Sequence, residues 1–439
     1  MLKYKICIKE DNMKKLLKII NNVLKTNLKN IDILKVEMDS RKIEKGDLFF
    51  AINNGNKYVN EVLEKGASIV ICDDKQWENI ENVIVVKDTV KAMQDIAREY
   101  RKVLDIKIVG IVGSNGKTTT KDIVYSILNT KYKVKKTLGN YNNHIGVPYT
   151  ILNLKEDDEF LSLEMGMSAK GEIKVLCEIA NPDYGIITNI GDSHLEFLKN
   201  RKNVFIEKSE IKNYVNSEKL FIFGDDRFLK DLDGIKIGFN TKNLYKIKNY
   251  IETDNGVNFE INGENYNFYL NGKHNAINAS FGVAFGKKLG LSQKEIQAGL
   301  NSCKVTSMRF EKVEKNGINY INDSYNASPI SMKYSLETFS NMYPNRDKVA
   351  VLADMGELGE NELEFHREVI EFALSLKIEK IILFGEMMER ASKSFRNQEN
   401  KIIIKKSKDE IRELIEEKFK DRLILLKGSN YNHLWKIMG

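Results

Sequence analysis

Cysteine and proline are scarce in this sequence, with four residues of each among 439. Cys7, Cys72, Cys177 and Cys303 lie far apart and form no CxxC pair. This spacing favours reduced, buried or half-buried thiols over a disulfide framework or a metal site. The chain also lacks a fixed-period repeat and a low-complexity linker, so we expect an ordinary folded protein.

Long apolar runs are missing as well. No window of the sequence approaches the roughly 18 uninterrupted apolar residues that a membrane span needs. The opening segment, MLKYKICIKEDNMKKLLKII, is interrupted by charges and lacks the apolar core of a signal peptide. Together these features predict a soluble, cytoplasmic protein with no membrane partner.

A strong excess of charge of one sign is also absent. The chain has 69 Lys and Arg against 62 Asp and Glu, a net charge of +7, and its lysines are spread over the whole length. Nucleic-acid-binding proteins usually concentrate basic residues in a patch, so we expect no nucleic-acid partner. The length predicts about two to four domains, and a hydrophobic content of 42% is ample for their cores.

What the sequence does contain is a regular alternation of strand-like and helix-like segments, which is typical of α/β proteins. Residues 1–103 combine short strands such as GDLFFAI with a helical stretch, TVKAMQDIAREYRKVL. Residues 104–306 alternate apolar strands with helices and predict a mostly parallel sheet. Residues 307–439 predict a Rossmann-like, doubly wound domain with ligands at the carboxyl ends of its strands. We therefore expect three α/β domains with these boundaries.

The most informative segment is GIVGSNGKTTTK at residues 110–121, which lies between a strand-like and a helix-like run. At such a turn, glycines let the backbone approach phosphates, and the helix N-terminus favours negative charge. Lys117 can reach the β and γ oxygens, and a following threonine can bind Mg²⁺. The glycines at 110, 113 and 116 depart from the general P-loop spacing, but the strand–loop–helix unit is complete. It predicts a P-loop-type ATP site.

The spacing GxxGxNGKTT resembles that of the Mur ligases, the ATP-dependent amide-bond synthetases of peptidoglycan assembly, and of their folylpolyglutamate synthetase relatives. The resemblance spans nearly the entire chain. Further motifs that resemble the family are DSRKIEKGDLFFAI (39–52), GNYNNHIGVPYTIL (139–152), LEMGMSAKGEI (163–173), TNIGDSHLEF (188–197), EKSEI (207–211), GKHNAINA (272–279), MRFE (308–311), NDSYNASPISM (322–332), VLADMGELGENELEFH (351–366) and LLKGS (425–429).

The segments NDSYNASP and DMGELG most resemble the branch of the family that adds a dipeptide. This resemblance implies a monomeric ligase that joins D-Ala-D-Ala to UDP-N-acetylmuramoyl-tripeptide through an acyl phosphate. It also implies that residues 1–103 bind the UDP-sugar substrate, residues 104–306 bind ATP and residues 307–439 bind the dipeptide. A sister ligase that adds the third stem residue, a folylpolyglutamate synthetase and a catalytically inactive nucleotide-binding module are the alternatives.

For ATP, the resemblance implies a loop formed by Gly113, Ser114, Asn115, Gly116, Lys117, Thr118 and Thr119. Asn275 and Asn278 resemble adenine contacts, because an amide can both donate and accept hydrogen bonds. Arg309 resembles a phosphate contact, and Asp323 resembles a ribose contact. Helix capping and surface charge are the structural alternatives for these residues.

Lys117, Glu164, His194 and Lys208 resemble the catalytic residues of the family. Glu164 and His194, together with Thr118, are then expected to hold two Mg²⁺ ions. A protonated Lys208 would repel such ions. In the family the lysine at this position carries CO₂ as a carbamate, which is an anionic oxygen ligand. A salt bridge, a structural histidine and a solvated lysine are the alternative roles.

The resemblance also implies substrate contacts. On the uridine-nucleotide side these are Ser40, Arg41, Asn142 and Asn143. On the side of the incoming dipeptide they are Tyr325, Asn326, Asp354 and Glu357. Turn formation is the alternative for Asn326, because YNASP is also turn chemistry. Ser328 stands where the family usually has a second asparagine.

Overall fold

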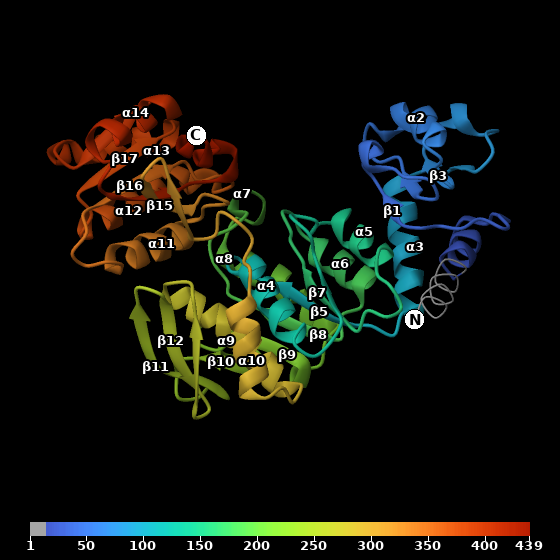
Figure 1. Cartoon of the computed structure of the whole chain (residues 1–439), viewed down its shortest axis with the longest axis horizontal. Coiled ribbons are helices and arrows are strands. Elements are labelled where there is room, and N and C mark those ends of the chain that lie inside the picture. Colours follow the sequence, from blue (N-terminus) through green and yellow to red (C-terminus); the bar gives the residue numbers. More distant parts are fainter. Residues whose placement is uncertain (1–14) are drawn as a thin grey trace.

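The computed structural model describes residues 15–439, in which three separate β-sheets follow one another along the chain. Figure 1 shows them as three successive lobes, with the first and the last lobe on opposite sides of the central one. The predicted α/β class with three sheet-containing units is confirmed, while the domain boundaries stay predictions. No helix within residues 15–439 combines the length and the apolar character that crossing a membrane requires.

The first sheet is small and entirely parallel, in the order β1-β2-β3-β4. Its elements are β1 (Val36–Glu37), β2 (Leu48–Phe50), α2 (Val59–Glu64), β3 (Ile69–Cys72), β4 (Val83–Val85) and α3 (Thr89–Val103). Helix α3 begins where the Asp88 side chain accepts a hydrogen bond from the Lys91 N–H, as an N-cap does. It buries Met93, Ile96 and Ala97, which recur at helical spacing and form its core-facing stripe.

The central sheet has nine strands in the order β13-β12-β11-β10-β9-β8-β5-β7-β6. Its strands are β5 (Lys107–Val112), β6 (Val134–Lys136), β7 (Phe160–Glu164), β8 (Tyr184–Ile187), β9 (Leu220–Phe223), β10 (Ile235–Gly238), β11 (Tyr245–Thr253), β12 (Gly256–Ile261) and β13 (Glu264–Phe268). Its helices are α4 (Lys117–Leu128), α5 (Gly146–Leu152), α6 (Glu172–Ala180), α7 (Leu195–Leu198), α8 (Arg201–Ser209), α9 (Lys273–Lys288) and α10 (Gln293–Ser302). The parallel part confirms the prediction. The antiparallel extension β11-β12-β13 was not predicted.

The last sheet has the order β14-β15-β19-β16-β17-β18, and every neighbouring pair except β14–β15 is parallel. Its elements are β14 (Glu311–Lys315), β15 (Ile318–Asp323), α11 (Pro329–Asn341), β16 (Lys348–Ala353), α12 (Glu362–Ser375), β17 (Lys380–Phe384), α13 (Glu386–Ser392), β18 (Ile402–Lys405), α14 (Lys408–Lys418) and β19 (Leu423–Lys427). The doubly wound prediction is confirmed. The chain ends in two short 3₁₀ turns, Asn430–Asn432 and Leu434–Met438.

The hydrophobic clusters connect the first two units more closely to each other than to the last unit. One cluster runs from Leu16 to Leu229 and so joins the first sheet to one face of the central sheet. The last sheet has clusters of its own, which begin at Phe310 and Ile318. Among the described residues, the partly buried Phe365 packs against the first cluster as well as against one of the last. The first two units therefore share a core, and the last unit packs largely by itself.

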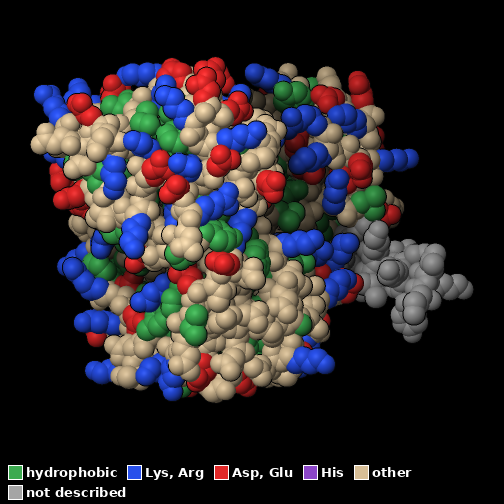
Figure 2. Space-filling model, turned by 60° about the vertical axis from the view of Figure 1, so that its left-hand side comes forward, with side chains coloured by type: hydrophobic (Ala, Val, Ile, Leu, Met, Phe, Trp, Pro, Cys, Tyr) green, Lys and Arg blue, Asp and Glu red, His purple; other side chains and the backbone are tan. Residues whose placement is uncertain are grey.

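The three described cysteines, Cys72, Cys177 and Cys303, are buried free thiols, as predicted. Cys7 lies outside the described residues. Lys and Arg side chains alternate with Asp and Glu side chains over the face of the molecule shown in Figure 2. This distribution agrees with the scattered charge pattern of the sequence.

Candidate active site

A cavity of about 1030 Å³ lies where loops of the central sheet face loops of the last sheet. Both sets of loops follow the carboxyl ends of parallel strands, where α/β folds place their ligands. The predicted residues that line it are Ser114, Asn115, Gly116, Lys117, Thr118, Thr119, Asn142, Asn143, Glu164, His194, Asn275, Asn278, Arg309, Asp323, Tyr325, Asn326 and Glu357. Gly113, Lys208, Ser40, Arg41 and Asp354 are not among the lining residues.

The phosphate loop joins the end of β5 to the start of α4 and has a backbone that glycine alone suits. Gly113 and Gly116 have φ angles of 146° and 80°, which L-residues with a side chain rarely adopt. A Cβ on Gly113 would collide with the Thr188 hydroxyl, and one on Gly116 would collide with Asn278 Oδ1. The loop can therefore lie directly against its neighbours and point free N–H groups of the helix N-terminus into the cavity.

Two cations from different parts of the chain meet above this loop. Lys117 folds back so that its Nζ donates to the carbonyl of Gly113 at 2.8 Å. Burial lowers the pKa of Lys117, and the carboxylate of Glu164 partly opposes this effect. Arg309, from the segment that leads into the last sheet, donates to Thr118 Oγ1 at 3.1 Å and stacks on Tyr325 at 4.0 Å. The cavity thus carries fixed positive charge, as a polyphosphate site requires.

Glu164 ends β7 and is 4% exposed. Its Oε1 accepts a hydrogen bond from Asn142 Nδ2 at 2.9 Å, whereas its buried Oε2 has no hydrogen-bond partner. Asn115 Nδ2 and Arg309 Nε are buried and unpaired in the same way. Buried polar atoms without partners are costly, and three of them in residues that line one cavity indicate a polar ligand.

His194 and Lys208 lie beside this group. His194 precedes α7 in the left-handed conformation, with its Nδ1 against Glu357 Oε2. Burial lowers its pKa, although the hydrogen bond to Glu357 acts in the opposite direction. Lys208 on α8 is 2% exposed and forms no hydrogen bond or ion pair with any described residue. Burial, and then the charge of Lys117, hold its pKa well below the usual value, which favours the neutral amine.

A metal ion beside the phosphate loop would need ligands from both the protein and a nucleotide. No group of three or more His, Cys, Asp or Glu side chains gathers within residues 15–439 in the manner of a metal centre. The hydroxyl of Thr118 and the unpaired oxygen of Glu164 are nevertheless hard oxygen donors beside a phosphate loop. Mg²⁺ is typically held in this way, by one or two protein oxygens and the phosphates of a nucleotide. The residues present therefore fit Mg²⁺.

Asn275 and Asn278 are buried in the first turns of α9 and line the cavity. Asn278 Nδ2 donates to Asn275 Oδ1 at 3.4 Å, and Asn275 Nδ2 donates to the carbonyl of Asn271 at 2.7 Å. Asp323, at the end of β15, accepts from the Phe310 N–H at 3.1 Å and pairs with Lys427 Nζ at 2.9 Å. The predicted adenine and ribose residues are thus brought together, although their sequence positions differ by almost 50 residues.

Sequence reasoning missed several residues of this site. Lys427 is buried, lines the cavity and also donates to the carbonyl of Asn326 at 2.7 Å. His274 stacks on Tyr334 with ring centroids 5.7 Å apart, and both rings line the cavity. The motifs LLKGS and GKHNAINA contain Lys427 and His274 and were the available signals. Tyr334 had none, because its position on α11 resembles that of any half-exposed helix residue.

The predicted dipeptide-binding residues in the loops of the last sheet differ in whether they face the cavity. Asn326 lines the cavity, and Glu357 reaches across it to His194. The carboxylate of Asp354 accepts instead from the backbone N–H groups of Met387 and Met388. It therefore caps α13, and its geometry favours a supporting role over contact with a dipeptide. Ser328 caps α11 and donates to Asn115 Oδ1 at 3.1 Å, so it ties the last sheet to the phosphate loop.

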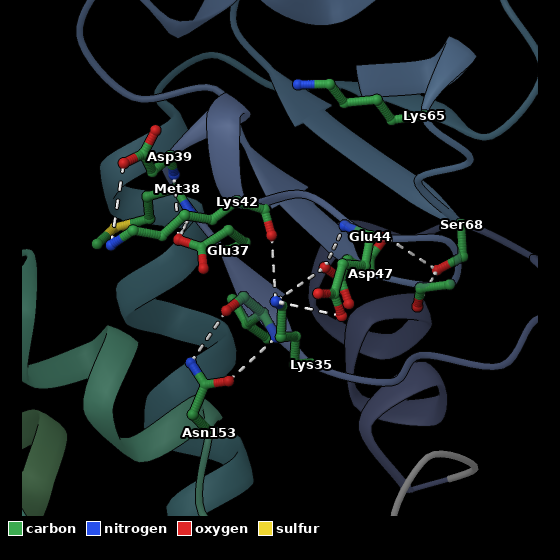
Figure 3. Close-up of polar contacts among 12 residues, drawn as sticks. Lys35, Glu37, Met38, Asp39, Lys42, Glu44, Asp47, Lys65, Ser68 and Asn153 are labelled. Carbon is green, nitrogen blue, oxygen red and sulfur yellow. Dashed lines mark hydrogen bonds and ion pairs between the residues drawn. The ribbon is translucent and has the colours of Figure 1, made fainter. Parts of the chain in front are cut away.

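Ser40 and Arg41 lie in the first unit, in the 3₁₀ turn Ser40–Lys42. Figure 3 shows this region, in which Asp39 follows strand β1. Arg41 pairs with Asp39 at 2.8 Å, and this hydrogen bond lowers the pKa of Asp39 to about 2. The structure does not bring Ser40 and Arg41 to the cavity, and within residues 15–103 no side chain lines it.

Comparison with known proteins supports the resemblance over most of the chain. Residues 111–286 match the Mur ligase middle domain, and residues 308–430 match the Mur ligase glutamate ligase domain. The chain is 37% identical over 420 residues to the UDP-N-acetylmuramoyl-tripeptide–D-alanyl-D-alanine ligase of Bacillus subtilis, covering 92% of each. Two solved structures named MurF are similar in fold. That of Acinetobacter baumannii has a TM-score of 0.85 at 25% identity, covering 96% of this chain and 97% of its own. That of Thermotoga maritima, in complex with ADP, has a TM-score of 0.81 at 28% identity, covering 92% and 96%.

Proposed function

The chain belongs to the Mur ligase family, and from this premise we propose the reaction that it catalyses. It is an ATP-dependent ligase that joins D-Ala-D-Ala to UDP-N-acetylmuramoyl-tripeptide. The new bond is an amide C–N bond, and the product is the UDP-linked pentapeptide precursor of peptidoglycan. This reaction belongs in the cytoplasm, where ATP and the nucleotide-linked precursor are found.

The observation that carries the choice of substrates is the similarity to the Bacillus subtilis ligase, because it extends over 92% of both chains. It therefore includes the first unit, which neither family model covers. The cavity between the central and last sheets supports the chemistry, since it combines a phosphate loop with cations from both units. The three units take the roles of UDP-sugar binding (1–103), ATP binding (104–306) and dipeptide binding (307–439).

The nucleotide binds in the cavity, where positively charged side chains face its phosphates. The loop of residues 113–119, with the N–H groups at the start of α4, holds the phosphates together with the side chains of Lys117 and Arg309. Lys117 gives up its bond to the Gly113 carbonyl in exchange for a phosphate oxygen, which is a stronger, charge-assisted partner. Asn275 and Asn278 read the adenine edge, and Asp323 accepts from the ribose hydroxyls.

Thr118, Glu164 and His194 hold two Mg²⁺ ions, with Lys208 as a carbamate completing the set. Bound Mg²⁺ neutralises the phosphate oxygens and stabilises the charge that develops during transfer. The neutral form of Lys208, favoured by its burial, is the form of an amine that combines with CO₂. The carbamate converts an unpartnered buried amine into an anionic oxygen donor.

The residues around the cavity then position two reacting groups. The terminal carboxylate of the tripeptide attacks the γ-phosphorus and releases ADP, which leaves an acyl phosphate. The amine of D-Ala-D-Ala attacks the acyl carbon, and inorganic phosphate leaves as the amide forms. Ser40, Arg41, Asn142 and Asn143 hold the UDP-linked substrate, while Tyr325, Asn326 and Glu357 receive the dipeptide. Positioning and charge stabilisation account for such catalysis.

A coupled assay of ADP release tests this proposal. Purified protein with ATP, Mg²⁺ and UDP-N-acetylmuramoyl-tripeptide should release ADP at a rate that depends on added D-Ala-D-Ala. Lys117→Ala should abolish this release, whereas Lys131→Ala, at an exposed position just after α4, should leave it unchanged. No dipeptide-dependent release by the wild type would refute the proposal. Turnover with a folate and glutamate, or with a free diamino acid and the UDP-dipeptide, would identify one of the alternative ligases.

A further inference from the structure

Asn153, which follows α5 in the central unit, is bonded to the backbone of strand β1 in the first unit. Its Oδ1 accepts from the Val36 N–H at 3.1 Å, and its Nδ2 donates to the Val36 carbonyl at 3.1 Å. Figure 3 shows this amide reaching the strand from below. Strand β1 is the edge of its sheet, so the side chain of Asn153 takes the place of a further strand at that edge.

The end of β1 is held as tightly as its edge. The carboxylate of Glu37, itself 6% exposed, accepts from the N–H groups of Met38 and Asp39 at 2.9 and 3.1 Å. The Tyr149 hydroxyl of α5 donates to the same carboxylate at 3.4 Å. Ser40 and Arg41 follow immediately in the chain. The direction in which they leave the sheet is therefore set by residues that α5 contacts.

The other end of α5 begins at the phosphate site. Asn143 Oδ1 accepts from the Gly146 N–H at 2.9 Å, where the helix starts, and the neighbouring Asn142 donates to Glu164 at 2.9 Å. With seven residues, α5 is about 10 Å long. It is a short rigid connection, with Asn142 and Asn143 at one end and Asn153 at the other.

We propose that Asn153 is a positioning residue for the uridine-nucleotide substrate, which sets Ser40 and Arg41 at a fixed place relative to Asn142, Asn143 and the phosphate loop. This inference rests on the proposed function, since it assumes that Ser40 and Arg41 contact that substrate. Val36 is 1% exposed, so without Asn153 its N–H and carbonyl are buried and unpaired. Strand β1 then shifts to find other partners, because buried backbone groups are rarely left unsatisfied.

The test compares Asn153→Ala with Asn129→Ala. Both asparagines are C-cap residues of helices in the central unit, but Asn129 is exposed and its side chain forms no hydrogen bond with a described residue. For Asn153→Ala we expect the KM for UDP-N-acetylmuramoyl-tripeptide to rise about tenfold, which is about 1.4 kcal/mol, while the KM for ATP stays within about twofold. We also expect faster amide hydrogen exchange in residues 36–41. Asn129→Ala should match the wild type in all three measurements.

The possible outcomes decide the matter as follows. A selective rise in the KM for the uridine nucleotide, with faster exchange at 36–41, supports the inference. Unchanged exchange and an unchanged KM in Asn153→Ala overturn it, and so does an equal rise of both KM values, which indicates general damage. If the wild type shows no dipeptide-dependent turnover, the proposed function fails instead. The exchange measurement then decides whether Asn153 holds β1.

Discussion

At the scale of single residues, Lys208 is the clearest conflict between stability and function. Its side chain is 2% exposed, its amine has no hydrogen-bond or ion-pair partner among the described residues, and placing an unpaired amine in such surroundings is destabilising. Such a residue is retained when a reaction needs it. The proposed carbamate explains why a lysine stands where an apolar side chain would pack better.

We therefore predict that Lys208→Met abolishes ligase activity and makes the protein more stable. The free energy of unfolding should rise by about 1–3 kcal/mol, the usual cost of a buried unpaired donor. Urea denaturation followed by circular dichroism measures this change. Lys202→Met serves as the control, because Lys202 is exposed on the same helix and should change neither property. A Lys208→Met variant that is active would contradict the assigned role.

At the scale of elements, the phosphate loop depends on how closely α4 and α9 approach each other. Gly116 is the N-cap of α4 with a φ of 80°, and Gly171 is the N-cap of α6 with the same φ. A Cβ on Gly116 would collide with Asn278 of α9, whereas a Cβ on Gly171 meets no atom within 4 Å. The two glycines share a backbone conformation and differ in their surroundings.

This pair of glycines gives a matched prediction. Gly171→Ala and Gly116→Ala each force a side chain into a left-handed conformation, at a cost of about 1–2 kcal/mol. Gly116→Ala must in addition displace Asn278 and the loop, so we expect it to lose nucleotide binding. Calorimetric titration with ADP and Mg²⁺ measures the affinity, which should fall at least about tenfold for Gly116→Ala and stay near the wild-type value for Gly171→Ala. Equal affinities in the two variants would contradict the role of the contact between α4 and α9.

At the scale of the whole molecule, the cavity with the candidate active site lies at a boundary between hydrophobic cores. The clusters that involve the first and central sheets contain no residue beyond Cys303, and those of the last sheet begin at Phe310. Around the cavity the units meet through polar contacts, which include Arg309 with Thr118, Ser328 with Asn115 and Glu357 with His194. The ring of His274 also stacks on that of Tyr334. Small polar interfaces of this kind permit relative motion, which closure around the reactants requires.

We predict that residues 1–306 and residues 307–439 fold when produced separately. Apart from the contact of Phe365 with the first cluster, each fragment keeps its clusters complete, so each should show a cooperative unfolding transition in urea when followed by circular dichroism. Neither should have ligase activity, because the phosphate loop and Arg309 are then in different molecules. A fragment that unfolds without a cooperative transition would show that the boundary between the cores lies elsewhere.

The sequence by itself determined the class of the fold and the presence of three sheets. It also identified the segment GxxGxNGKTT as the loop that binds phosphate. These are properties of short segments: apolar periodicity favours strand or helix, and the order of glycines, lysine and threonine between a strand and a helix indicates a phosphate loop. The strands β11–β13 were not predicted from the sequence, because polar residues alternate along them and face solvent on one side of the sheet. They carry no long apolar run of the kind that marked the buried parallel strands.

Only the tertiary structure decided which of the candidate residues come together. It placed Glu164, Arg309 and Lys427 at one cavity, turned Asp354 towards α13, and kept Ser40 and Arg41 at a distance, in a turn that follows the strand bonded to Asn153. The physical reason is that contacts between residues far apart in the sequence depend on how whole elements pack. No local pattern encodes that packing. The role of a lysine such as Lys427, or of an asparagine such as Asn153, therefore depends on the residues that it contacts in the folded chain.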